Sequence, residues 1–243
     1  MELTVMHLYP DFMSLYGEYA NVAVLRRHLK AMDVTVTVQA VTGTEDPPEF
    51  EKADLIYMGA GTERKQKIAL QELQPVRRGL KAAVEQGTLL LFTGNAMEIL
   101  GASVTDSSGK CWTGLELAEF TTVESDRRTA ADAVATPVLW DAPAVGFMNK
   151  CSVTYGVTTP LFKELPLGFG NDAEHGAEGY MSGSIFATHI TGPVLVKNPD
   201  FIDLLIRRMF ERRGWVLPEK LPVLPHEREA YAVTLKELQG RIT

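Results

Sequence analysis

Short apolar runs alternate with segments of helical periodicity over the first hundred residues. The runs occupy residues 3–9, 34–41, 54–58 and 88–92, and turn-forming residues such as Pro, Asp and Gly follow most of them. Short apolar runs that are rich in β-branched residues and bounded by turns are typical of strands. We therefore predict four strands here, the last of which, TLLLF, has the uniform hydrophobicity of a strand buried on both faces.

Helical segments lie between these strands. We predict that Asn21 caps an amphipathic helix, and that further helices occupy about 63–73 and 75–86, the last ending at Gly87. Strands that alternate with helices predict an α/β fold, in which helices cover both faces of a parallel sheet and the ligand site lies beyond the carboxyl ends of the strands. The first candidates for a site are therefore the loops that begin at Pro10, Gly59 and Thr93.

The pattern changes after about residue 115. Short strand-like runs follow one another, namely LELAEFTTVE, AVATPVLW, SVTYGVTT and SIFATHITG, and they predict that the sheet continues in partly antiparallel form. Asn198 and Pro199 then start a helix that stops at Gly214, and a Pro-rich connector leads to a final polar helix. We predict one domain over residues 1–243, with the connector and last helix at about 215–243.

Charge and cysteine content exclude several classes of protein. The 24 basic and 31 acidic residues give a net charge of -7 that is spread along the chain, which argues against nucleic acid as a partner. No apolar run approaches the roughly 20 residues of a membrane-spanning helix and no signal segment is present, so we expect a cytoplasmic protein without a membrane span. Cys111 and Cys151 are too few for a disulfide framework. The loop with Asp172, Glu174 and His175 lacks a recurring ligand spacing, and we predict neither a metal nor a cofactor.

Two Gly-rich turns that follow predicted strands have the form of catalytic loops. Residues 85–101, EQGTLLLFTGNAMEILG, read as a buried strand, a tight turn of small residues and a helix, which is the arrangement of a nucleophile elbow. Residues 59–66, GAGTERKQ, form a turn in which backbone amides can stabilise an oxyanion beside such an elbow. Either turn alone is weak support, because glycine also serves close packing in α/β proteins.

Further segments make the pattern specific. Together with these turns, the sequence resembles the GatD family of class I, triad-type glutamine amidotransferases over nearly the whole chain, in the segments LYGEYANVAVLRRH (15–28), DRR (126–128), VGFMN (145–149), GFGND (168–172) and GPVLVKN (192–198). The resemblance implies a three-layer, doubly wound, flavodoxin-like fold with a mostly parallel sheet and an antiparallel extension. It also implies the glutaminase subunit of lipid II isoglutaminyl synthase, which releases ammonia for a Mur-ligase-like partner, MurT, in cell-wall synthesis.

The two principal catalytic residues of that family are missing from their expected positions. In such enzymes a Cys thiolate attacks the glutamine amide and a His shuttles the proton. The family's elbow reads Cys-Gly-Gly-aromatic-Gln, and its ungapped equivalent here runs from Gly94 to Glu98, so that Gly94 stands at the nucleophile position. The family's histidine precedes a Gly-Pro pair, and here Thr191 precedes Gly192.

Other groups are poor replacements for them. Successive strand side chains point to opposite faces, so Thr93 should not reach the apex of the elbow. His189 lies two residues before the histidine position, and we expect it to fill the structure or to make a surface contact. Neither Cys111 nor Cys151 lies in an elbow-like sequence.

Arg128 matches the position that resembles the family's binder of the glutamine carboxylate. A guanidinium suits a carboxylate because its fork donates two parallel hydrogen bonds. The alternative is a solvated charge within the run 126–128. We expect the pocket to be bounded by the 10–18 loop, residues 59–66, residues 94–98 and Arg128, with substrate contacts from Gly59, Ala60, Gly61, Asn95 and Arg128.

Three hypotheses of function follow. The first is a GatD-like subunit without glutaminase activity that binds glutamine or a related small ligand, or regulates a MurT-like Mur ligase in a heterodimer. The second is an active glutaminase subunit that supplies ammonia for amidation of a cell-wall precursor. The third is a scaffold or interaction protein without a small-molecule site.

Overall fold

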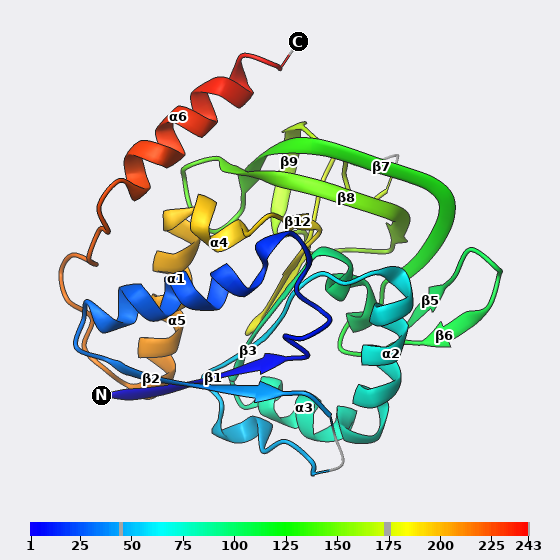
Figure 1. The fold of residues 1–243 in the computed structure, drawn as a ribbon, viewed down its shortest axis with the longest axis horizontal. Coiled ribbons are helices and arrows are strands. Elements are labelled where there is room, and N and C mark those ends of the chain that lie inside the picture. Colours follow the sequence, from blue (N-terminus) through cyan, green and yellow to red (C-terminus); the bar gives the residue numbers. More distant parts are fainter. Residues whose placement is uncertain (44–45, 173–175, 243) are drawn as a thin grey trace.

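The computed structural model describes residues 1–43, 46–172 and 176–242. Its first sheet has the strand order β10-β11-β4-β3-β1-β2, and all neighbours are parallel except β10 and β11 (Figure 1). The predicted mostly parallel α/β sheet is therefore present. Its strands are β1 (Glu2–Leu8), β2 (Thr35–Val41), β3 (Leu55–Met58), β4 (Leu89–Thr93), β10 (Tyr180–Ser182) and β11 (Ile185–Thr188).

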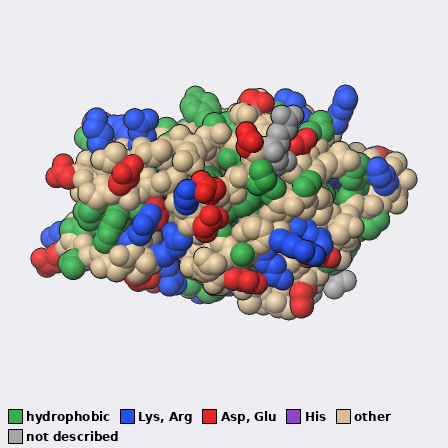
Figure 2. All heavy atoms as spheres, turned by 90° about the horizontal axis from the view of Figure 1, so that it is seen from below, with side chains coloured by type: hydrophobic (Ala, Val, Ile, Leu, Met, Phe, Trp, Pro, Cys, Tyr) green, Lys and Arg blue, Asp and Glu red, His purple; other side chains and the backbone are tan. Residues whose placement is uncertain are grey.

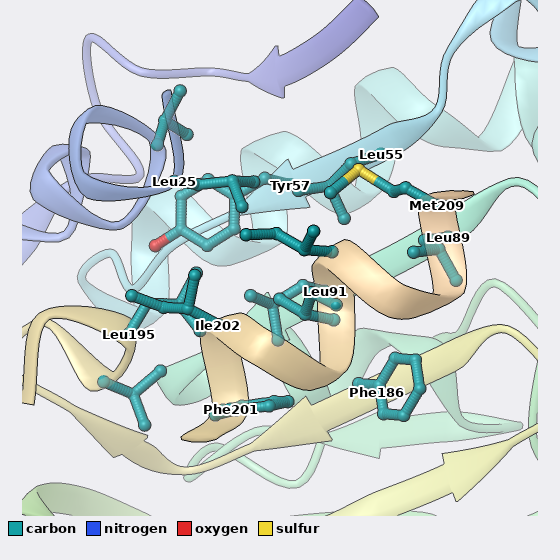
Figure 3. Packing of buried hydrophobic residues seen from close by; sticks show 14 of the residues in the cluster. Leu25, Leu55, Tyr57, Leu89, Leu91, Phe186, Leu195, Phe201, Ile202 and Met209 are labelled. Carbon is teal, nitrogen blue, oxygen red and sulfur yellow. The ribbon is translucent and has the colours of Figure 1, made fainter. Parts of the chain in front are cut away.

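Helices cover both faces of this sheet because its strands carry apolar side chains on both faces. Leu55 and Tyr57 pack on one side in a cluster with helices α1 (Tyr19–Lys30), α4 (Val194–Lys197) and α5 (Pro199–Arg213). Figure 3 shows this cluster, in which Ile202 of α5 lies beside Tyr57 and Leu91. Ile56 and Met58 point to the opposite side, into a cluster with α2 (Glu63–Leu73) and α3 (Arg77–Glu85). The result is three layers, as expected of strands whose successive side chains alternate between faces.

The antiparallel part of the chain forms mainly a second sheet, instead of extending the first. Its order is β12-β8-β7-β5-β6, with β9 paired to β7, and only β5 and β7 are parallel neighbours. The predicted runs around 121–124 and 133–137 belong to one long strand, β7, which is interrupted by a register shift between Glu124 and Thr129. The strands are β5 (Ser103–Thr105), β6 (Cys111–Thr113), β7 (Thr121–Pro137), β8 (Ala144–Tyr155), β9 (Phe162–Leu167) and β12 (Ile190–Thr191).

The helix ends test the capping predictions. Helix α5 begins at Pro199 after Asn198 and ends at Gly214 in a left-handed conformation with φ 64°, as predicted. The predicted cap at Asn21 is wrong, because α1 begins at Tyr19 and Asn21 is buried within the helix. The Asn21 side chain instead donates to the Tyr57 hydroxyl at 2.8 Å. It also accepts from the Leu195 backbone N–H at 2.8 Å.

The last helix, α6 (Glu227–Gln239), packs near β7, β8 and α4 and is tied to α1 by a 2.8 Å contact between Glu227 and His28. Figure 2 shows acidic and basic side chains interspersed over one face of the molecule. None of the helices in the described residues is long and apolar enough to cross a membrane. The single domain and the cytoplasmic location stay predictions.

Candidate functional site

The expected elbow lies where β4 ends. Gly94 follows the strand with φ +61°, a backbone conformation that glycine adopts without steric cost. The helix expected after it is a 3₁₀ helix, η4 (Gly94–Leu100). The chain therefore makes the sharp turn of an elbow, with glycine at its apex.

A side chain at Gly94 has no room in this fold. A Cβ atom built there would lie 2.5 Å from the Cβ of Ala60 and 3.3 Å from its Cα. Contacts below 3.0 Å between such atoms essentially never occur, so the backbone around one of them would have to shift. The methyl group of Ala60 thus occupies the space into which a nucleophilic side chain would project.

A buried carboxylate joins the end of β4 to Thr191, the residue predicted to stand at the histidine position. Glu18 is fully buried, and its Oε1 accepts from the Thr191 hydroxyl at 2.6 Å and from the Gly192 backbone N–H at 2.9 Å. Its Oε2 accepts from the Tyr57 hydroxyl at 2.8 Å and from the Thr93 hydroxyl. The side chains of Thr93 and Thr191 are therefore both engaged with Glu18, and neither is directed at a substrate. Burial, followed by the charge of Glu18, raises the pKa of Tyr57 well above its ordinary value.

A cavity of about 190 Å³ lies beside the elbow. Its walls come from four parts of the chain that are far apart in the sequence. They are the 3₁₀ helix η1 (Leu15–Gly17), the start of α2, η4 and the β7–β8 pair, and they include parts of the predicted boundary. Gly59 does not line it and is packed against Glu18 and Met13 instead. The lining residues are Leu15, Tyr16, Ala60, Gly61, Thr62, Glu63, Asn95, Glu98, Arg128, Asn149, Lys150 and Cys151.

Arg128 reaches the cavity from the irregular part of β7. Between Glu124 and Thr129 the pairing with β8 shifts, and such bulges re-aim side chains. Its guanidinium donates to Asn149 Oδ1 at 2.9 Å and to Glu63 Oε1 at 2.5 Å. The hydrogen bond to Glu63 raises the pKa of Arg128, and it helps to lower the pKa of Glu63 against the opposing effect of burial. Arg128 is therefore a paired charge, and its role in binding glutamine stays a prediction.

The turn at residues 59–66, in which we predicted backbone amides for an oxyanion, forms hydrogen bonds within the chain. The Gly61 backbone N–H donates to Asn95 Oδ1 at 3.0 Å, and Asn95 Nδ2 donates to the Gly61 carbonyl at 2.9 Å. This reciprocal pair joins the two Gly-rich turns. Substrate contacts by Gly59, Ala60, Gly61 and Asn95 stay predictions.

His189 lies in the interior of the protein and not at the surface, so of the two roles expected for it, structural filling is the one that fits its position. It lies between β11 and β12 and is buried, with Nδ1 at 3.0 Å from Glu178 Oε1 and Nε2 at 3.6 Å from Glu98 Oε1. Burial alone would lower the pKa of His189, and Lys150 acts in the same direction, but Glu178 and Glu98 outweigh both and raise it. Glu98 also accepts from Gln66 at 2.6 Å. The buried cluster of His189, Glu178 and Glu98 therefore holds η4 in place through Glu98.

Three residues that line the cavity lie outside its predicted boundary, namely Asn149, Lys150 and Cys151 of β8. The Cys151 thiol donates to Glu63 Oε1 at 3.2 Å, and burial together with Glu63 raises the pKa of Cys151 to about 12. Such a thiol stays protonated at neutral pH and is a poor nucleophile. Cys111 is exposed on β6. Glu174 and His175 of the loop considered for metal binding lie outside the described residues.

Comparisons with known proteins place the chain in a family. The sequence profile of the CobB/CobQ-like glutamine amidotransferase domain matches residues 4–199. The chain is 30% identical over 213 residues to subunit GatD of the lipid II isoglutaminyl synthase (glutamine-hydrolyzing) of Staphylococcus aureus (strain N315), covering 88% of this chain and 86% of that protein. The corresponding GatD subunit of Streptococcus pneumoniae (strain ATCC BAA-255 / R6) is 24% identical over 215 residues, covering 87% of this chain and 82% of that protein.

Solved structures share the fold at low sequence identity. A glutamine amidotransferase, 14% identical, superposes with a TM-score of 0.52 over 86% of this chain and 98% of its own. The glutaminase domain of Trypanosoma brucei CTPS with bound acivicin, 10% identical, gives 0.51 over 92% of this chain and 98% of its own. The predicted class I amidotransferase fold is thereby confirmed. The chain belongs to the CobB/CobQ-like glutamine amidotransferase family and, within it, to the GatD subunits.

Proposed function

We propose that this chain is a GatD-type subunit that does not hydrolyse glutamine and that binds and regulates a Mur-ligase-like partner in the amidation of a cell-wall precursor. Two relatives that the chain covers over more than four fifths of their length are subunits of lipid II isoglutaminyl synthases. A subunit can keep its association surface after its chemistry is lost, because the two depend on different residues.

The loss of activity rests above all on the relationship between Gly94 and Ala60. The glycine supplies no nucleophile, and the alanine methyl group fills the place of the missing side chain, since its Cβ lies only 2.5 Å from the position that a Cβ on residue 94 would take. A thiol is indispensable to a mechanism that passes through a thioester. The absence of a nucleophile at Gly94 and the lack of space beside it both favour an inactive site.

The Glu18 cluster supports the same proposal. An imidazole at residue 191 would serve as proton shuttle, but the Thr191 hydroxyl is a hydrogen-bond donor to Glu18 at 2.6 Å. The thiol nearest the elbow cavity is that of Cys151, and its pKa near 12 leaves almost no thiolate at neutral pH. The described residues of the cavity therefore offer neither an activated nucleophile nor a free base.

The direct test is ammonia release from L-glutamine by the purified chain, alone and with its native partner, with the Staphylococcus aureus GatD complex as the positive control. We expect no turnover above background in either form. Wild-type turnover that persists after removal of contaminating glutaminases would contradict the proposal and favour the active glutaminase subunit, and its loss in a Cys111→Ser/Cys151→Ser variant would assign the nucleophile to one of these thiols.

The association is tested separately by pull-down from the native cell followed by mass spectrometry. We expect repeated recovery of a Mur-ligase-like, ATP-dependent synthetase. Recovery of the chain alone, under conditions that preserve other complexes of that cell, would contradict the proposed association with a ligase. It would also mean that a scaffold role of this chain does not involve a ligase.

A further inference from the structure

The polar side chains around the 190 Å³ cavity are all paired within the chain. Asn95 is paired with Gly61, and Asn149 donates to the Tyr16 hydroxyl at 2.9 Å. Lys150 donates to the Gly170 carbonyl at 2.5 Å. Thr62 accepts from the Lys65 backbone N–H at 3.3 Å, and Glu98 accepts from Gln66 and Ser152. A polar ligand therefore competes here with partners inside the chain.

The pair most relevant to a ligand is Glu63 with Arg128. Glu63 is the first residue of α2, where the helix dipole favours a negative charge. Its Oε1 lies 2.5 Å from the Arg128 guanidinium and accepts from the Cys151 thiol at 3.2 Å. Asn149 holds the other guanidinium nitrogen at 2.9 Å. Arg128 is thus held on two sides, and the carboxylate that it binds is the chain's own.

We propose that Glu63 determines the specificity of this cavity by acting as an internal carboxylate on Arg128, so that free small carboxylates such as amino acids are excluded. This rests on the proposed function, because an active glutaminase would have to admit its substrate. A ligand carboxylate that takes both terminal nitrogens of Arg128 displaces Glu63 and Asn149 from them and lies beside the negative charge of Glu63, and like charges at such separations repel. The cavity is also smaller than the roughly 300–1,000 Å³ of drug-sized pockets, which limits it to small ligands.

Arg128 becomes available when the charge of Glu63 is removed. In a Glu63→Gln variant the residue keeps its size and its place at the start of α2, but a neutral amide competes less well than a carboxylate for a guanidinium. The cavity should then accept a ligand carboxylate on Arg128. The gain must disappear when Arg128 is replaced as well.

The experiment is a titration with L-glutamine, followed by amide chemical shifts and by calorimetry. The proteins are the wild type, Glu63→Gln, Glu63→Gln/Arg128→Gln and a control, Glu51→Gln, which removes an exposed carboxylate outside the cavity. We expect the wild type and the control to bind equally weakly, Glu63→Gln to bind at least about tenfold more tightly, and the double variant to lose that gain. The carboxylate-free analogue 4-aminobutanamide should show no gain with any variant.

Equal affinity of wild type and Glu63→Gln for L-glutamine would overturn the inference, and so would a gain that survives the loss of Arg128. A Glu63→Ala variant is titrated in parallel, and we expect it to bind L-glutamine at least as tightly as Glu63→Gln. Failure of the proposed function is distinguishable, since it would appear as ammonia release by the wild type. An inert wild type whose Glu63 variants gain no binding would overturn only the role of Glu63.

Discussion

Glu18 and Thr191 are separated by 173 positions in the sequence, and the Thr191 hydroxyl donates to the Glu18 carboxylate at 2.6 Å. The same carboxylate contacts Thr93 at the end of β4, next to the elbow. One buried acid therefore bridges Thr191 and the end of the strand that precedes Gly94. The hydroxyls of Tyr57, Thr93 and Thr191 and the Gly192 backbone N–H all donate to Glu18, so we assign Glu18 a structural role.

Glu18→Gln should destabilise the protein. The amide has one oxygen in place of two, and its NH₂ group would face the donors that now point at the carboxylate. We expect the free energy of unfolding to fall by about 1–3 kcal/mol, the usual cost of leaving buried polar groups unsatisfied. Urea denaturation measures it, with the exposed Glu119→Gln as the matched control. Equal stability of the two variants would show that the cluster rearranges freely.

Gly94→Ala should lower the stability of the protein through a steric clash, in addition to the strain of an alanine with a positive φ. Gly183 is a matched control, because it has φ +56° and nothing within 4 Å of a built Cβ, whereas Gly94 has φ +61° and meets Ala60 at 2.5 Å. We expect Gly94→Ala to cost about 1–3 kcal/mol more than Gly183→Ala, the typical penalty of overpacking. Adding Ala60→Gly should recover most of that difference in urea denaturation. A double variant as unstable as Gly94→Ala would contradict the steric account.

Chemistry should return only when space, thiol and imidazole are supplied together. In a Cys111→Ser/Cys151→Ser background, Ala60→Gly/Gly94→Cys should provide a thiol of ordinary reactivity. Further addition of Thr191→His should place an imidazole beside Glu18 and speed alkylation by iodoacetamide near neutral pH, because a neighbouring imidazolium lowers a thiol pKa. Weak ammonia release from glutamine should accompany it. If the variant that lacks the Thr191→His substitution reacts as fast, residue 191 is not the histidine position.

The His189 cluster predicts a loss of stability at alkaline pH. The pKa of His189 is raised above 6.5 in the folded state, so its ion pairs stabilise the fold fully below pH 6.5 and cease to do so as the pH rises through the folded-state pKa. The difference in unfolding free energy between wild type and His189→Gln should therefore shrink as the pH rises above about 6.5. Urea denaturation across that range tests this, and a constant difference would mean that the imidazole stays neutral throughout.

Local patterns predicted much of the fold, because they carry their own boundary residues. Asn198, Pro199 and Gly214 delimit α5, and the run TLLLF became β4 in the middle of the first sheet. The capping prediction for Asn21 failed since its side chain is used for a tertiary contact with Tyr57, which sequence spacing does not reveal. The long strand β7 was divided in prediction because a charged bulge interrupts its apolar alternation.

The site was predictable as far as it rests on the backbone. The Gly-rich turns and Arg128 lie around one cavity, because loops after parallel strands gather at one edge of a sheet. The partners of these residues were not predictable. Glu18 and Glu63 look like ordinary surface acids in the sequence, and only the tertiary structure shows that one is buried beneath the elbow and the other is bound to a distant arginine.

His189 is the single residue between β11 of the first sheet and β12 of the second. The backbone passes from one sheet to the other at this residue, and its side chain is fastened to Glu178 on one side and faces Glu98 of η4 on the other. Displacement of the second sheet would therefore pull directly on the segment that follows the elbow. Through this one residue, a movement of the second sheet is passed to the turn after β4 by the backbone and by a side chain at the same time.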